Sequence, residues 1–358
     1  MENIRLLFIC FELDRNSAVL SWQEKLAGKL STKTDFTLVM TQKAGTYELP
    51  ENTLVYEVPA RPYGIPARFG GYWLINYQIY KLCKKYNINC CFIHMAHEWA
   101  LRLFPAFFSL KLPILLWYAH GSVPWRLRLT ERIATRIITS TKEGFRINSR
   151  KVKIIGQAID TNLFDLRQKT GNKNTIIYVG RISRRKRIEL IMQVMSELAK
   201  LENYKEVKLR IVGSPLTYDD ISYERYLKTL VWNNGLQNRV TFEGFVPQQY
   251  IPALYDDVFL HINFSETGSM DKTVMESLAC GCPVLTTNIA FRDLFSELPD
   301  YFMKEVDIPD TTRRICNLYD SRELNDGQKL RNLVVGNHDM DGYVDKIMEI
   351  IKTLPGEK

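Results

Sequence analysis

Residues 176–186 read Ile-Ile-Tyr-Val-Gly-Arg-Ile-Ser-Arg-Arg-Lys, and this segment decides the fold class. The β-branched run before Gly180 predicts a buried strand, and the apolar spacing from Ile188 onward predicts a helix. Between them lies a basic turn that contains Arg181 and Lys186. Such a turn can bind a phosphate group, because backbone N–H groups and the helix dipole face the anion. A solvated basic loop would carry the same charges, so this segment alone leaves both interpretations open.

Apolar runs typical of buried strands alternate along the whole chain with helical patterns, such as those at residues 18–30 and 72–85. In the first half the expected strands are residues 4–10, 36–41, 54–58, 90–95, 114–118, 137–140 and 152–155. In the second half they are residues 176–179, 207–212, 240–242, 258–262 and 284–286. Parallel strands that alternate with helices make right-handed crossovers and have both faces covered. The pattern therefore predicts two doubly wound α/β domains, each with a ligand site at the carboxyl ends of its strands.

The length supports this division, since 358 residues are about twice a common domain size. The first half ends with a strand, and a polar tract at residues 167–174 leads into the next one. We expect a first domain at residues 1–160 and a second domain at residues 161–342. The C-terminal helix, residues 343–358, is expected to join the first domain.

The composition bounds the compartment and the partners. A net charge of +8 favours anionic partners such as nucleotides, phospholipid surfaces or nucleic acid. Seven cysteines, with Cys90 and Cys91 adjacent, fit a reducing compartment better than a disulfide framework. The N-terminal apolar run is too short for a signal peptide, and no apolar stretch reaches the length of a membrane span. We therefore expect a cytoplasmic protein, soluble or peripheral on the inner face of the membrane.

A second informative segment, residues 265–287, follows the strand expected at residues 258–262. A turn rich in small polar residues enters a helix, which Gly281 ends. The helix N-terminus offers free N–H groups and a positive dipole, to which Lys272 adds a charge. Glu276 lies about one turn into the helix, where its carboxylate can accept hydrogen bonds from both hydroxyl groups of a ribose. A phosphate site and a diol site on one turn describe a pocket for a nucleoside diphosphate.

These segments together resemble the carboxyl-terminal half of glycosyltransferase family four, a group of retaining enzymes with the GT-B fold. The resemblance rests on the order and spacing of five motifs. They are Gly180-Arg with Lys186, Leu209-Arg-Ile-Val-Gly213, Gly235 to Val246, Tyr255-Asp-Asp-Val258, and Glu276 to Val284. Upstream, residues 152–164 and Tyr118-Ala-His-Gly121 resemble the family's linker and its amino-terminal loop. The resemblance implies an α/β protein of GT-B fold, in which two Rossmann-like domains face a cleft.

The resemblance also implies roles for individual residues. Arg181 and Lys186 would bind the donor diphosphate and stabilise its charge in place of a metal ion, and His120 would approach the transferred sugar from the first domain. Glu276 would hold the ribose. The expected donor-site residues are Gly180, Gly213, Phe245, Val246, Glu266, Ser269, Met270, Asp271, Lys272, Thr273, Val274 and Glu276. Within this set, Gly213, Phe245 and Val246 would border the nucleobase, and the turn 269–273 would present backbone N–H groups to the sugar and the phosphates.

The sequence departs from the family pattern at two places. The family carries a second glutamate eight positions before Glu276, and that position here is Gly268. Glu266 is the candidate to replace this glutamate from a different backbone path. The paired-glycine loop that follows the family's first strand is absent from residues 10–17. The donor-sugar contacts and the acceptor contacts are therefore the parts that the resemblance defines least.

The implied reaction transfers a hexosyl group from a UDP- or GDP-linked sugar to a hydroxyl of a glycan or lipid-linked acceptor, with retention at the anomeric carbon. Neither a metal nor any other cofactor is expected. The residues His94 and His97 straddle a predicted strand end, whereas zinc motifs need histidines on one helix face. A nucleotide-sugar epimerase on the same fold and an inactive nucleotide-sugar-binding protein are alternatives. A nicotinamide dehydrogenase is disfavoured, because no G-x-G-x-x-G follows the first strand.

Basic and aromatic residues form two groups in the first half of the chain. One group consists of Arg61, Tyr63, Arg68, Tyr72, Trp73, Tyr77, Tyr80, Lys81, Lys84 and Lys85. The other consists of Trp125, Arg126, Arg128, Arg132 and Arg136. They are interpreted either as solvated faces or as a surface for anionic lipid or a phosphate-bearing acceptor. Nucleic acid is not expected as a partner, because no recognised binding module accompanies the charge.

Overall fold

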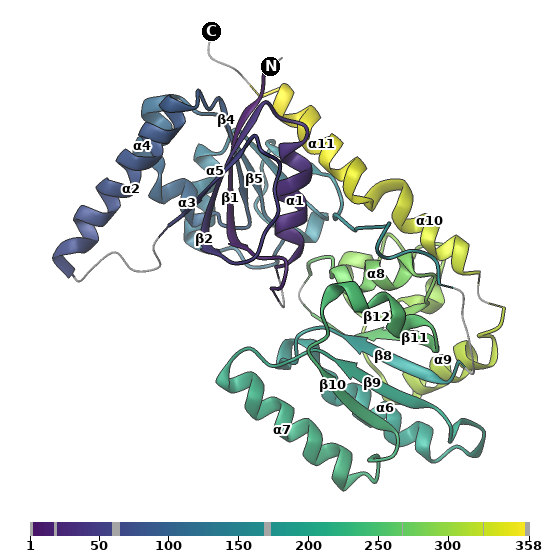
Figure 1. Ribbon diagram of the computed structural model, residues 1–358. Coiled ribbons are helices and arrows are strands. Elements are labelled where there is room, and N and C mark those ends of the chain that lie inside the picture. Colours follow the sequence, from purple (N-terminus) through teal and green to yellow (C-terminus); the bar gives the residue numbers. More distant parts are fainter. Residues whose placement is uncertain are drawn as a thin grey trace. The chain divides into compact units, whose positions relative to one another are not determined.

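The computed structural model describes residues 3–17, 20–58, 65–167, 173–266, 268–324 and 326–354 (Figure 1). The packing of the chain separates two compact units. Unit 1 consists of residues 1–156 and 340–358, and unit 2 consists of residues 157–339. Among the described helices, none is long and apolar enough to cross a membrane.

Unit 1 contains a parallel seven-stranded sheet in the order β3-β2-β1-β4-β5-β6-β7. The strands are β1 (Arg5–Leu13), β2 (Phe36–Ala44), β3 (Thr53–Glu57), β4 (Cys90–His94), β5 (Ile114–Trp117), β6 (Arg136–Thr139) and β7 (Val152–Ile154). Every residue of β4 and β5 is buried, because helices cover both faces of a parallel sheet. The strand order reverses between β1 and β4, so the topological switch point of unit 1 lies there.

The helices of unit 1 lie on both faces of this sheet (Figure 1). They are α1 (Trp22–Ser31), α2 (Ile65–Lys85), α3 (Glu98–Arg102), α4 (Phe104–Leu110), α5 (Trp125–Ile133) and α11 (Met340–Lys352). The helices α2 to α5 pack into one core cluster with the sheet. On the other face α11 packs against α1, and Lys29 of α1 forms an ion pair of 2.5 Å with Asp341. These contacts attach the C-terminal helix to unit 1.

Unit 2 contains a parallel five-stranded sheet in the order β10-β9-β8-β11-β12. The strands are β8 (Thr175–Val179), β9 (Lys208–Val212), β10 (Val240–Gly244), β11 (Val258–Asn263) and β12 (Val284–Thr286), and the helices are α6 (Ile188–Ala199), α7 (Tyr218–Asn233), α8 (Lys272–Ala279), α9 (Ile308–Asp320) and α10 (Gly327–His338). The helices α6, α7 and α9 share a core cluster with one face of the sheet, and α8 and α10 share a cluster with the other. The switch point of unit 2 lies between β8 and β11.

Candidate functional site

The loops after β8 and β11 meet at the switch point of unit 2, where a doubly wound sheet binds its ligand. The loop after β8 carries the basic turn predicted from the sequence, and the loop after β11 leads into α8. Both predicted halves of the nucleotide pocket therefore lie at neighbouring strand ends.

Two glycines let the loops after β8 and β9 approach each other closely. Gly180 has φ +152° and Gly213 has φ +135°, backbone conformations that L side chains rarely adopt. A Cβ atom on Gly213 would lie 1.9 Å from the carbonyl oxygen of Gly180. The backbone N–H of Gly180 donates to the carbonyl of Val212 at 2.9 Å. Only glycine fits at position 213, so the sequence requirement at this strand end is steric.

The basic turn positions its two key cations differently. Arg181 is exposed, and its backbone carbonyl accepts a hydrogen bond of 2.8 Å from the Tyr178 hydroxyl. Lys186 ends a 3₁₀ turn, and its Nζ donates to Oδ2 of Asp271 at 2.9 Å. The exposed fractions of the Lys186 and Asp271 side chains are 16% and 14%. The turn thus presents one solvent-facing guanidinium and one enclosed ammonium.

Asp271 is held by several polar groups. Asn263 donates to the same Oδ2 atom at 3.0 Å from the end of β11. Burial acts to raise the pKa of Asp271, but the charge of Lys186 and hydrogen bonds from Lys186, Asn263 and Ser265 hold that pKa below its usual value. His261 lies buried in the same strand as Asn263, and burial lowers its pKa to about 3. Asp271 is therefore ionised and His261 neutral near pH 7.

Glu276 lies just over one turn into α8, with only 6% of the residue exposed. Its Oε1 accepts a hydrogen bond of 3.0 Å from Nε2 of Gln248. Lys272 at the start of α8 donates from Nζ to the carbonyl of Ala158 at 2.7 Å. Burial lowers the pKa of Lys272, while the charge of Glu276 acts against that shift. Lys272 thus fixes the start of α8 to residue 158, near the beginning of unit 2. Glu276 is the buried carboxylate of this helix.

The turn before α8 is fixed through its carbonyl groups. Asn288 donates to the carbonyl of Ser269 at 2.8 Å, and Gln157 donates to that of Met270 at 3.1 Å. The side chains of Met270 and Val274 belong to a hydrophobic core cluster. These two residues can therefore contribute only backbone groups to a ligand.

Of the remaining predicted residues of unit 2, Thr273 in α8 and Val246 after β10 are half-buried, and the other two are exposed. Phe245 follows β10 with 45% of the residue exposed, and Val246 packs partly against the core. Glu266 forms an ion pair of 2.5 Å with Arg187, and 67% of its side chain is exposed. The structure therefore brings Lys186 and Asp271 into direct contact, whereas Glu266 is bonded to a cation outside that pair.

His120 lies in unit 1, just after β5, and lines a cavity of about 470 Å³. The backbone N–H of Ser122 donates to its Nδ1 at 3.0 Å, so the neutral ring carries its proton on Nε2. Aromatic and polar side chains share the cavity: Phe11, Trp99, Tyr118, Gln42 and His97. This mixture of ring faces and hydrogen-bonding groups at strand ends suits a polyhydroxylated ligand.

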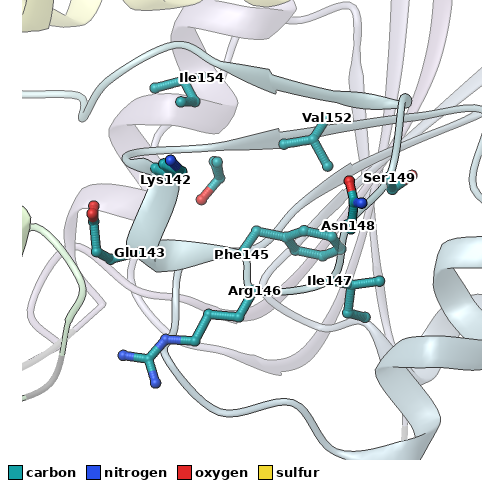
Figure 2. A pocket seen from close by; sticks show the side chains of 10 residues that line it. Lys142, Glu143, Phe145, Arg146, Ile147, Asn148, Ser149, Val152 and Ile154 are labelled. Atoms are coloured by element: carbon teal, nitrogen blue, oxygen red, sulfur yellow. The ribbon is translucent and has the colours of Figure 1, made fainter.

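A second cavity of unit 1, of about 580 Å³, lies beside β6 and β7. Figure 2 shows the Phe145 ring among its lining side chains and Arg146 extending away from that ring. None of the site residues predicted from the sequence is among the residues that line it.

Sequence reasoning missed Asn263 and Gln248, which hold the two site carboxylates. Asn263 could have been found from the sequence, because it ends an apolar strand at the expected switch point. Packing alone rarely places a polar residue at such a buried position. Gln248 lies in a short 3₁₀ turn after β10 and carried no such signal.

The sequence similarity of this chain to a known protein family lies within unit 2. Residues 160–326, all within unit 2, match the model of the family described as glycosyl transferases group 1. Mannosylfructose-phosphate synthase of Agrobacterium fabrum is 24% identical over 155 residues, which are 40% of this chain and 34% of that protein. Alpha-monoglucosyldiacylglycerol synthase of Streptococcus pneumoniae is 32% identical over 129 residues, which are 35% of this chain and 27% of that protein. The matches thus span about a third of the length of these curated relatives.

The fold extends over the whole chain. The crystal structure of HepE from Anabaena in complex with UDP has a TM-score of 0.77 and 15% sequence identity, covering 98% of this chain and 100% of that one. The predicted GT-B fold of two Rossmann-like domains is confirmed. The matches of unit 2 to known proteins support the predicted family. The chain has the GT-B fold, and its residues 160–326 are similar to the glycosyl transferases group 1.

Proposed function

We propose that this protein transfers a hexosyl group from a nucleotide-diphosphate sugar to a hydroxyl of a glycan or lipid-linked acceptor, without a metal and with retention. The observation that supports this most is the set of groups at the switch point of unit 2. An exposed guanidinium, an enclosed ammonium and the N-terminus of α8 lie there beside the buried carboxylate of Glu276. This combination suits a diphosphate and a ribose on one molecule.

In the proposed step, the bond between the anomeric carbon and the diphosphate oxygen breaks, and its electron pair stays with the diphosphate. The acceptor oxygen forms the new bond on the same face of the sugar, and its proton passes to the departing nucleoside diphosphate. Arg181 and Lys186 stabilise the charge that grows on the leaving group, which is the work that a divalent ion would otherwise do. Glu276 orients the donor by accepting hydrogen bonds from the ribose.

The cavity that contains His120 is the proposed acceptor side. The protonated Nε2 of its neutral form can donate to a sugar hydroxyl in this cavity, and the aromatic rings can pack against the apolar faces of sugar rings. A related protein is named as a synthase of a glycosylated diacylglycerol, which supports including lipid-linked hydroxyls among the acceptors.

A ligand screen followed by a transfer assay tests the proposal. UDP- and GDP-sugars are first ranked by the rise in Tm that they cause. The best donor is then incubated with lipid and oligosaccharide extracts in the presence of EDTA, and the anomeric configuration of the product is read by NMR. We expect an EDTA-resistant product of retained configuration. An epimerised donor without acceptor would instead show an epimerase, and tight binding with neither transfer nor hydrolysis would show an inactive binding protein.

We further propose that the protein works in the cytoplasm, peripheral on the inner face of an anionic membrane. Of the predicted first basic and aromatic group, Arg61 and Tyr63 and the side chain of Arg68 lie outside the described residues. Trp73 and Tyr77 of α2 are 60% and 55% exposed and follow each other at helical spacing. Lys81, Lys84 and Lys85 continue the same exposed face. Exposed aromatics beside lysines suit the interface of a bilayer that carries negative lipids.

The neighbouring helix α4 extends this surface. Asn76 of α2 donates to the carbonyl of Arg102 at 2.9 Å and accepts from the backbone N–H of Ala106 at 3.2 Å, which fixes α2 beside α4. Phe108 of α4 is 73% exposed. Isolated exposed apolar residues are common, but several on two packed helices mark a contact surface.

Vesicle sedimentation tests the membrane surface. The double variant Trp73→Ser with Phe108→Ser should reduce binding to phosphatidylglycerol vesicles, while wild-type binding to phosphatidylcholine vesicles should be weak. Trp232→Ser is the matched control, since Trp232 of α7 is 72% exposed on a helix that carries acidic residues as well. Equal binding by the double variant and the wild type would exclude this surface.

A further inference from the structure

Asp271 is the group in the unit 2 site that diphosphate binding leaves unexplained. Its carboxylate lies 2.9 Å from Nζ of Lys186, the ammonium proposed to meet the leaving group. A diphosphate bound to Lys186 would therefore share that cation with a second negative charge. Like charges that share one cation repel each other, and they do so strongly where water is largely excluded.

A capping role does not account for Asp271. It occupies the N-cap position of α8, yet its side chain makes no capping hydrogen bond to the helix. The carboxylate is instead bonded to Lys186 and to Asn263. The N–H groups that begin α8 consequently receive nothing from this side chain, although carboxylates at N-cap positions commonly satisfy them.

Stability does not account for the pair either. Removing two charges from water costs free energy that their mutual attraction only partly returns, so an enclosed ion pair is weak evidence for a stabilising role. Hydrogen bonds from Asn263 and Ser265 also help to keep this carboxylate ionised. An ionised carboxylate only accepts hydrogen bonds, so hydroxyl or N–H groups of a donor can meet it and phosphates cannot. Of these groups, the hydroxyls of the transferred sugar lie next to the diphosphate that Lys186 is proposed to meet.

We propose that Asp271 is a specificity-determining residue that accepts hydrogen bonds from the hydroxyls of the transferred sugar and rejects sugars that carry a carboxylate. Lys186 then lies between this carboxylate and the diphosphate, and it balances both. The inference rests on the proposed function. Asp271, three residues after Gly268, would then supply the carboxylate that the family pattern has at position 268. Glu266 is the weaker candidate, because 67% of its side chain is exposed and it is paired with Arg187.

Calorimetric titration of the full chain with UDP, UDP-glucose and UDP-glucuronic acid tests this assignment. The corresponding guanosine series, with GDP, GDP-mannose and GDP-mannuronic acid, replaces it if the wild type binds GDP and not UDP. The wild type should bind the neutral sugar nucleotide more tightly than the acidic one. In Asp271→Asn this preference should shrink by about tenfold, the effect of losing a hydrogen bond to a charged group. The bare nucleoside diphosphate should bind at least as tightly as before, because Lys186 no longer faces a carboxylate.

Asp257→Asn is the matched control, because Asp257 forms a 2.9 Å ion pair with Arg210 elsewhere in unit 2. It should leave the preference for the neutral sugar as it is in the wild type. Asp271→Glu keeps the carboxylate and the charge balance, and it should keep discrimination against the acidic sugar even if the asparagine variant does not fold.

Three results would overturn the assignment. They are an unchanged preference in Asp271→Asn, equal weakening of all three ligands in that variant, and a loss of preference in Glu266→Gln instead. If the wild type binds no nucleotide of either series, the proposed function fails, and that result is distinct from a failure of the Asp271 assignment.

Discussion

The two units have the same architecture and different strand ends. Each is a doubly wound parallel sheet with a switch point. Unit 2 presents cations, carboxylates and close-packed glycines there, whereas the unit 1 cavity is lined by aromatic rings and histidines. The shared sheet therefore determines only where a ligand binds. The residues after the strands determine its chemistry, so the proposed ligand is a polyanion in unit 2 and a polyhydroxylated molecule in unit 1.

Replacing Lys186 with alanine should produce the largest change. The variant loses a positioned cation and leaves Asp271 without its charge partner, so turnover should fall about 100-fold, as with the loss of one oxyanion donor. Steady-state kinetics with a saturating donor measures this. Arg185→Ala removes an exposed cation from the same turn and should retain turnover. Equal turnover in both variants would break the contrast between the units, because the enclosed cation would then have no special role.

The strand ends of unit 2 were predictable from the sequence, because the residues that indicate them are adjacent in the chain. The strand, the glycine and the basic turn are contiguous, and the segment that leads into α8 is contiguous as well. The pairing of Lys186 with Asp271 could not be predicted, because 85 residues separate them and only the sheet order brings them together. The same holds for Gln248 and Glu276, which are 28 residues apart.

Helix α2 shows a different limit of sequence reasoning. Its apolar pattern predicts a helix from Tyr72 to Lys85, but the helix begins at Ile65. Gly70 and Gly71 are unfavourable in a helix interior, so the sequence pattern predicts a helix only after them, whereas the actual helix runs through them. In unit 1 the site residues were also harder to find, because aromatic and histidine side chains at strand ends are compatible with ordinary core packing.

Glycine 213 should show the next largest effect, on stability. Gly213→Ala places a Cβ against the Gly180 carbonyl and should lower the free energy of unfolding by about 1–3 kcal/mol through overpacking. Gly235→Ala is the control, since Gly235 also has positive φ but no atom within 4 Å of an added Cβ. Urea unfolding of both variants separates steric contact from backbone strain. A loss for Gly213→Ala no greater than for Gly235→Ala would show that the β8 and β9 loops are not in close contact.

Glu276→Gln should affect donor binding and leave the fold intact. Replacing the charged acceptor with a neutral amide weakens its hydrogen bonds to the ribose, so the Kd for the nucleoside diphosphate should rise about tenfold. A nucleotide that lacks the 2′ and 3′ hydroxyls should bind the variant and the wild type equally. If the variant also lost affinity for that deoxygenated nucleotide, Glu276 would act through the packing of α8 and not through the diol.

The smallest expected effect is a difference between the two units in how acid changes their stability. In unit 1, burial lowers the pKa of His97, with Glu98 opposing that shift and Arg126 adding to it. As the pH falls, His97 therefore takes up a proton in the unfolded chain before it does so in the folded chain. Proton uptake by the unfolded chain lowers the free energy of unfolding as the pH falls below about 6.5. In unit 2 the pKa of Asp271 is lowered, so its contribution is present above about pH 4 and is lost as the pH falls through the folded pKa. The apparent Tm measured against pH should therefore differ from wild type in different windows for His97→Gln and Asp271→Asn. If both variants departed from wild type in the same window, the ionised carboxylate would not be what distinguishes the unit 2 site.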